Sequence, residues 1–245
     1  MNSFNFDGTS SAAFSMKIYK KNIYSGPERS QEIVAVPGRD GDLIFDNGNY
    51  NNIEVSYSCD FRYIEENASQ IKNWLCKAGY KRLTDTYDTT SFRQAAFIGP
   101  LNISEAIKNV GSAEIKFNCK PYKYLNSGET SVTLNTSTTA KTINNAESYS
   151  SLPLFEITAS KQITLQITNS AGSTSRTITF PSTSKKLYID SELMAVYDDS
   201  MTLYNDVIDF VEFPTFKPGN NSIKFTKGTG ATLTSASVKP RWRKL

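Results

Sequence analysis

The side chains that could do chemistry in this chain are mainly carboxylates, because the sequence contains no histidine. Without imidazole there is no Ser-His-Asp or Cys-His nucleophile, no histidine metal cluster, and no base naturally poised near neutral pH. Paired carboxylates could still perform acid–base or metal chemistry. A glycosidase, for example, needs two Asp or Glu residues placed across a cleft.

Asp85 and Asp88 are the carboxylate pair whose spacing could suit a metal or acid–base site. The stretch from Tyr80 to Asp88 is typical of a strand entering a turn, where aspartates are usually solvated or hydrogen-bonded to nearby backbone. We therefore interpret both as turn residues. No other arrangement singles out a pair, so a carboxylate glycosidase is kept only as an alternative, and we expect no enzymatic activity.

The three cysteines do not suggest a metal site or a disulfide framework. Cys59, Cys76 and Cys119 are odd in number, far apart, and lack a C-x-x-C pair. We interpret them as small buried hydrophobic residues of a protein made in a reducing compartment. We expect no metal and no cofactor.

A second charged group could recognise a partner instead of a substrate. It lies between two apolar runs, 33–36 and 43–45, and consists of Arg39, Asp40 and Asp42. Pro37 fixes its own φ near a turn value, and two nearby glycines can take positive φ, so the chain can reverse direction here. We predict a hairpin with these charges at its tip. The tip is either merely soluble or docks onto a partner of complementary charge.

One amphipathic helix is predicted between residues 63 and 79. Apolar residues recur there at three- and four-residue spacing, namely Ile64, Ala68, Ile71, Leu75 and Ala78. Glu65 and Glu66 suit the positive end of the helix dipole, and Gly79 suits the C-terminal cap. Trp74 borders this stripe and is interpreted as core packing.

The rest of the first half is predicted to be strands. Residues 53–61 and 113–119 alternate strictly between apolar and polar, with the second run ending at 120–122. Shorter strands are predicted at 4–6, 14–18, 80–88 and 92–98, and a turn cluster at 47–52. Each strand has one apolar face to cover, so we expect a sheet with the one helix laid across it.

Composition changes at 124–129, where a stretch rich in Ser, Thr and Asn begins. Beyond residue 151, short alternating strands with turn residues between them and no helical period predict an antiparallel β-sandwich. We therefore expect two domains, 1–125 and 126–245. The fold class is mainly β.

Charge and hydropathy exclude several partners. The 245 residues carry a net charge of +3, too weak and too diffuse to predict nucleic-acid or membrane-surface binding. The N-terminus lacks the features of a signal peptide, and no apolar run approaches a membrane span. We expect a soluble chain that is synthesised in the cytoplasm.

The order of several short motifs resembles that of distal tail proteins (Dit) from siphophages that infect Gram-positive bacteria. In the first half these motifs are Phe6-x-Gly8, residues 36–43, Ile71-x-x-Trp74-Leu75, Leu83-x-Asp85-x-Tyr87-Asp88 and Phe117-x-Cys119-Lys120-Pro121. In the second half they are residues 152–154, 189–192, 213–214, 218–223 and 240–243. The resemblance covers nearly the whole chain, and its specificity comes from order and spacing together.

The resemblance implies a structural virion protein at the distal tip of a phage tail. It implies a tail-tube-like N-terminal β-sandwich or barrel with one helix, and a galectin-like C-terminal β-sandwich. Such proteins form a homo-hexameric ring that joins the tail tube to the tail-tip hub and, in many phages, to receptor-binding proteins, with DNA passing through its channel. In such a ring Arg39, Asp40 and Asp42 would lie at a subunit or tube interface.

One feature departs from the galectin pattern. Galectins hold sugar with His, Asn and Arg side chains and a stacking Trp, whereas this chain has no His and its second half contains only Trp242. Sugar binding is therefore not carried over from the resemblance. The alternative function is a module that binds host wall polysaccharide through exposed Tyr or Trp on the C-terminal sandwich.

Overall fold

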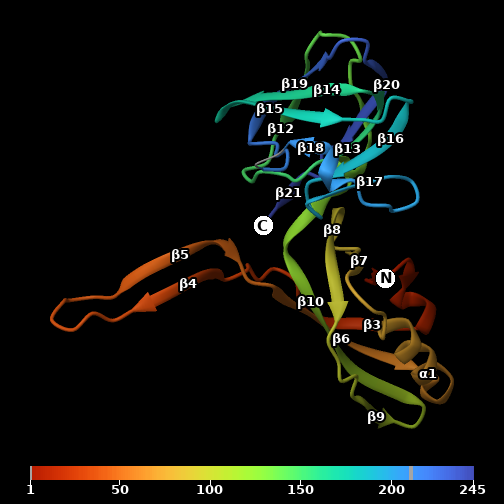
Figure 1. Ribbon diagram of the computed structural model, residues 1–245. Helices are drawn as coiled ribbons and strands as arrows, with labels where there is room; N and C mark the ends of the chain where they lie inside the picture. Colours follow the sequence, from red (N-terminus) through yellow and green to blue (C-terminus); the bar gives the residue numbers. More distant parts are fainter. Residues whose placement is uncertain (1, 210–211) are drawn as a thin grey trace. The chain divides into compact units, whose positions relative to one another are not determined.

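The computed structural model describes residues 2–209 and 212–245, and its chain divides into two compact units (Figure 1). The first unit runs to Lys123 and includes Leu245; the second comprises Tyr124–Lys244. Both are built mainly from antiparallel strands, which confirms the predicted fold class. Within the described residues there is one α-helix, α1, Ile64–Leu75.

Unit 1 is organised around one sheet with the strand order β2-β1-β7-β8-β10-β6-β3, and β9 pairs beside β10. The strands are β1 Phe4–Phe6, β2 Thr9–Ser10, β3 Lys17–Asn22, β6 Ile53–Arg62, β7 Lys81–Asp85, β8 Asp88–Phe97, β9 Ile103–Ile107 and β10 Val110–Leu125. Two further strands, β4 Arg29–Val34 and β5 Leu43–Tyr50, pair with each other and with no other strand that the structure describes.

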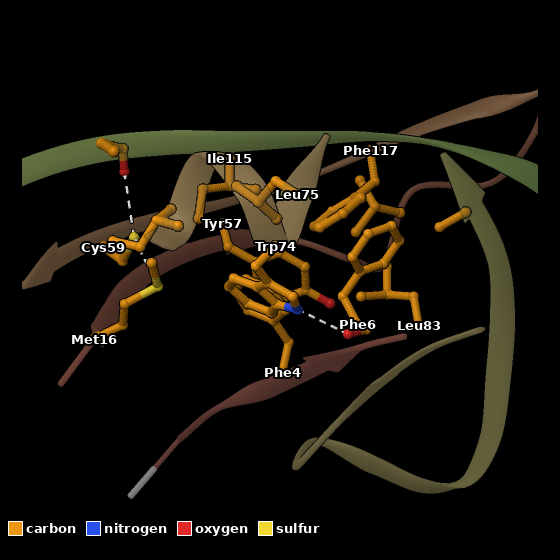
Figure 2. Close-up of a cluster of buried hydrophobic side chains, with 14 of the residues drawn as sticks. Phe4, Phe6, Met16, Tyr57, Cys59, Trp74, Leu75, Leu83, Ile115 and Phe117 are labelled. Atoms are coloured by element: carbon orange, nitrogen blue, oxygen red, sulfur yellow. Dashed lines mark hydrogen bonds between the residues drawn. The ribbon is translucent and has the colours of Figure 1, made fainter. Parts of the chain in front are cut away.

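The core of unit 1 joins α1 to the first strand of the chain (Figure 2). The Trp74 indole N–H donates to the Phe6 carbonyl oxygen at 2.8 Å. The Phe4 ring stacks on Tyr57, with centroids 4.5 Å apart, and on Trp74 at 5.5 Å. Ile71, Trp74 and Leu75 are buried, so the predicted core role of Trp74 is confirmed.

The helix is shorter than predicted. It ends at Leu75, because Cys76 has left the helical region at ψ 63° while its N–H still bonds the Lys72 carbonyl. Gly79 has a φ of +72° and lies beyond the helix end, and Ala78 is exposed. The side chain of Ile64, predicted to start the stripe, lies outside the described part.

Two of the three cysteines are buried, as predicted. Burial raises the pKa of the Cys59 thiol and of the Cys119 thiol to about 12 each. Cys59 lies against the sulfur of Met16 at 4.0 Å. Cys76 is exposed, so its predicted burial is wrong; it follows the last residue of the apolar helix stripe.

Two other strand limits differ from the prediction. A 3-10 turn occupies Ser11–Phe14, so the strand expected from residue 14 begins only at Lys17. β10 continues past Pro121 to Leu125. Proline is tolerated there because the pairing of β10 with β6 ends at Cys119, and beyond that point a missing N–H breaks no bond to β6.

Unit 2 is an antiparallel sandwich of two five-stranded sheets, as predicted. One sheet has the order β11-β20-β13-β16-β17, with β11 Val132–Thr133, β20 Thr232–Lys239, β13 Leu154–Ser160, β16 Lys185–Asp190 and β17 Ala195–Tyr197. The other has the order β12-β19-β14-β15-β18, with β12 Lys141–Asn145, β19 Gly219–Lys227, β14 Gln162–Asn169, β15 Gly172–Thr179 and β18 Ile208–Asp209. Inward side chains of both sheets, including Phe155 and Leu165, share one core.

The C-terminal segment is fixed to unit 2 by a buried ion pair. Arg241 donates two hydrogen bonds, at 2.7 and 3.0 Å, to the two carboxylate oxygens of Asp190, which is only 1% exposed. Burial alone would lower the pKa of Arg241, but the bonds to Asp190 hold it above its ordinary value. Gly128 lies against this segment so closely that a Cβ there would lie 2.3 Å from the Trp242 nitrogen. The backbone of the C-terminal segment therefore packs directly against the backbone of residues 125–128, with hydrogen bonds between them.

The turn between β7 and β8 is built on two carboxylates. Asp85 Oδ1 accepts the backbone N–H groups of Tyr87 and Asp88, both at 2.9 Å. Asp88 accepts from the hydroxyls of Thr90 and Ser91 at 2.8 and 2.6 Å and pairs with Lys123 at 3.2 Å. Burial opposes ionisation of Asp88, yet these donors together hold its pKa well below the ordinary value.

Arg241→Ala should destabilise the folded chain by about 3–5 kcal/mol, because it leaves the Asp190 carboxylate buried without a cation. Urea unfolding followed by tryptophan fluorescence measures this, since Trp242 is the neighbouring residue. Lys186→Ala removes exposed ion pairs to Glu156 and Asp199 and should cost at most about 1 kcal/mol. Equal losses in the two variants would contradict the assignment.

Asp88→Asn should lower stability at neutral pH by about 1.5–3 kcal/mol, the value of a hydrogen bond to a charged group. Because the folded pKa of Asp88 is depressed, its carboxylate stabilises the fold above the ordinary Asp pKa of about 4. That stability is lost as pH falls through the folded value, so the gap between wild type and variant should narrow below about pH 4. Thermal unfolding at several pH values tests this, with Glu54→Gln as the control from an exposed pair. A gap that is constant with pH would contradict the assignment.

Candidate assembly interface

The strands β4 and β5 form a hairpin that stands apart from the main sheet of unit 1, drawn in orange in Figure 1. We call residues 28–51 the arm, because the Asn51 N–H closes it on the Glu28 carbonyl at 2.8 Å. The hairpin predicted around residues 36–45 is confirmed. Its strands extend further toward the main sheet than predicted.

Both faces of the arm carry apolar side chains. Ile33 lies opposite Ile44, and the next pair along, Val34 with Leu43, projects from the other face, as does Phe45. Ile33, Ile44 and Phe45 are 63%, 62% and 56% exposed. A two-stranded ribbon is marginally stable in water unless its apolar side chains are covered. The arm therefore has the character of a surface that contacts another molecule.

The base of the arm is braced by side chains. Arg29 donates to Asp46 at 2.5 Å and to the Tyr50 hydroxyl at 3.1 Å. The Tyr50 ring meets the Tyr122 ring edge-on, with centroids 6.0 Å apart. The Gly48 N–H, and then Arg29, lower the pKa of Asp46 below its ordinary value. These contacts hold the base in place and leave the distal apolar part uncovered.

The turn cluster predicted at 47–52 is wrong over most of its length, because β5 continues through Tyr50. Gly48 has a φ of +76°, and the register of β4 and β5 shifts between Arg29 and Gln31. The glycine therefore accommodates a bulge instead of a reversal. Only Asn51 and Asn52 lie between strands.

The tip of the arm presents the three charges identified from the sequence. Gly38 and Gly41 both have a φ of +79°, and the Arg39 N–H bonds the Val36 carbonyl at 3.2 Å. The exposed side chains there are Arg39, Asp40 and Asp42. Within the described part of the chain, none of the three makes an ion pair or a side-chain hydrogen bond. Both charge signs are therefore available to a partner.

Asp85 and Asp88, the carboxylates considered for acid–base or metal chemistry, use their oxygens in hydrogen bonds that shape the turn between β7 and β8. Asp85 and Asp88 bond the backbone and hydroxyls of their own turn, which confirms their interpretation as turn residues. The cavity beside them is about 20 Å³, close to the size that holds one water. In residues 2–209 and 212–245 no group of three or more Cys, Asp or Glu is placed to hold a metal ion.

No described helix has both the length and the hydropathy needed to cross a bilayer.

The exposure of Ile33, Ile44 and Phe45 was not predicted from the sequence. An apolar run without alternation is typical of a strand buried on both faces. The pattern is the same whether neighbouring strands of the same chain or another molecule cover those faces. No signal in the sequence separates the two cases.

No protein-family model and no curated protein matches the chain. Solved structures do match, among them the Dit protein (gp 19.1) of SPP1, described as a paradigm of the hub adsorption apparatus in phages infecting Gram-positive bacteria. The TM-score is 0.75 and the match covers 100% of both chains, at 11% sequence identity. At that identity the likeness concerns the fold. The chain thus has the fold of the SPP1 distal tail protein over its whole length.

Proposed function

We propose that this chain is a structural protein of a phage tail, a distal tail adaptor that assembles into a homo-hexameric ring. The observation that carries the proposal is the match to SPP1 Dit, which extends over the whole length of both chains. In this role the chain would join the tail tube above to the tail-tip hub below, and anchor receptor-binding proteins where the phage has them. DNA would pass through the channel of the ring at the tip of the virion.

The arm is the element of unit 1 suited to the contact between ring subunits. A ring needs a heterologous contact, in which one surface of each copy meets a different surface of the next. Ile33, Ile44 and Phe45 supply apolar surface that this chain leaves uncovered. The charges at the tip, Arg39, Asp40 and Asp42, would fix register and orientation more than they add affinity.

No observation favours polysaccharide binding as a second function. The Trp242 ring packs against Phe216, with centroids 5.9 Å apart, and belongs to the margin of the unit 2 core. Tyr188 and Tyr197 stack on each other at 5.4 Å, and the Tyr188 hydroxyl donates to Asp199. Each of these two rings has one face covered by the other, so the pair offers a poor platform for stacking a sugar ring.

The double substitution Ile33→Ser and Ile44→Ser should abolish the hexamer that we expect for the wild type. Removing two buried isoleucines from a contact costs about 3–6 kcal/mol. Native mass spectrometry and negative-stain images down the symmetry axis measure the assembly. Tyr24→Ser, an exposed residue outside the arm, serves as the control and should leave the ring intact. A wild-type protein that stays monomeric at high concentration, and also fails to join the neighbouring tail proteins, would refute the proposed function.

Arg39→Glu should impair assembly without altering the fold, because it reverses the one positive charge at the arm tip. Mixing time courses followed by light scattering report the rate and extent of assembly. Circular dichroism and thermal unfolding should match the wild type, since the exposed Arg39 side chain makes no ion pair or side-chain hydrogen bond in the described part of the chain. If assembly proceeds as in the wild type, the tip does not belong to the interface.

A further inference from the structure

Unit 2 has its own exposed apolar surface, separate from the arm. Among the described residues of unit 2, every large hydrophobic side chain that is clearly exposed lies within eleven positions of the sequence, at Leu193, Met194, Met201 and Leu203. They come from the two turns on either side of β17, the edge strand of its sheet. We call residues 191–206 the β17 margin. Exposed apolar side chains gathered along one edge strand are typical of an interaction site.

The β17 margin is held in a defined conformation. The Asp190 carboxylate accepts the N–H groups of Glu192 and Leu193 at 2.9 and 3.1 Å. In the second turn, the Asp198 carboxylate accepts the Ser200 and Thr202 N–H groups at 2.9 and 3.1 Å. Lys185 pairs with Asp198 at 3.2 Å. Both turns therefore present their apolar side chains from a backbone that the chain itself fixes.

The far side of β17 is lined by the chain that returns from the second turn. Leu203 bridges Tyr197, and Tyr204 donates its N–H to the Val196 carbonyl at 2.7 Å. Since Tyr197 also lies opposite Tyr188, the side chains of Tyr188, Tyr197 and Leu203 share the outer face of the sheet. Leu203 thereby extends an aromatic row to the edge of the sheet.

The backbone of both turns disfavours the methionines that occupy them. Met194 has a φ of +51° and Met201 a φ of +61°, in the left-handed region that favours Gly and Asn. Their side chains are 70% and 65% exposed, so packing within the chain does not compensate. Folding alone therefore does not explain methionine at either position. Strain at an exposed residue points to a role for its side chain outside the fold.

The charge of this part of the chain has one sign. Between residues 187 and 216 the sequence has no Lys or Arg and seven acidic residues, Asp190, Glu192, Asp198, Asp199, Asp206, Asp209 and Glu212. Arg241 pairs with both Asp190 and Glu192, so its single positive charge offsets one of the two, and Lys185 pairs with Asp198. Asp199 shares Lys186 with Glu156, while its own side chain is 65% exposed. Asp206 is exposed in the 3-10 turn Asn205–Val207 beside β17. Negative charge thus borders the apolar side chains.

We infer that the β17 margin docks a basic amphipathic segment of a partner protein. The apolar face of such a segment would cover the two methionines and two leucines, and its Lys and Arg side chains would lie against Asp199 and Asp206. Methionine suits this role because its flexible, polarisable side chain adapts to different apolar surfaces. The inference concerns unit 2 alone and does not depend on the proposed ring.

The test compares the full chain with its Met194→Asn and Met201→Asn double variant. Asparagine tolerates the left-handed conformation, so thermal stability should be unchanged or higher. The probe is a labelled amphipathic helical peptide of Leu and Lys, about 18 residues long. Fluorescence anisotropy should show binding to the wild type that weakens when salt is raised from about 0.05 to about 0.5 M. The double variant should bind at least about tenfold more weakly.

Tyr63→Asn is the matched control. Tyr63 is also a non-glycine residue at positive φ, +59°, and is half exposed, but it lies in unit 1. It should leave peptide binding unchanged. Equal binding by the double variant, or equal binding of a peptide with Glu in place of Lys, would overturn the inference. So would a wild type that ignores the peptide and self-associates through the margin in sedimentation experiments.

Discussion

A two-stranded β-ribbon has no interior, so apolar side chains on its two faces can leave water only by contacting something else. This constraint sets the arm apart from the rest of unit 1. The main sheet buries its apolar face in a core that it shares with α1, whereas among the described residues β4 and β5 pair only with each other. Ile33 and Ile44 are therefore the residues from which an assembly function can be argued physically.

Each unit is completed by a segment from an end of the chain. In unit 1 the strand Phe4–Phe6 is fixed by the Trp74 indole and pairs with β7. In unit 2 the segment around Arg241 is fixed by Asp190, whose carboxylate also organises the turn at the β17 margin. Asp190 therefore contributes both to the stability of the sandwich and to the conformation of the exposed β17 margin. An element that projects for contact needs such a fixed base, as the arm has in Arg29, Asp46 and Tyr50.

Local periodicity was enough to predict β6, the position of α1 and the core role of Trp74, because each depends on one buried face. It failed where another interaction decided the outcome. At Gly48, for example, a bulge lets β5 continue through residues that were predicted to form a turn. Cys76 is exposed because the helix ends one residue before it. Of the candidate site, the charges at the tip were predictable, but the exposure of the arm depends on what surrounds it.

The two exposed apolar surfaces differ in ways that imply different partners. The arm tip carries both charge signs, so identical copies can present complementary groups to one another. The β17 margin carries predominantly one sign, and two copies of it brought together would place carboxylates against carboxylates, which costs free energy. Repulsion between the carboxylates would therefore oppose the apolar attraction between two copies of the margin. A cationic segment removes that conflict, so the margin is better suited to a second kind of protein than to another copy of this chain.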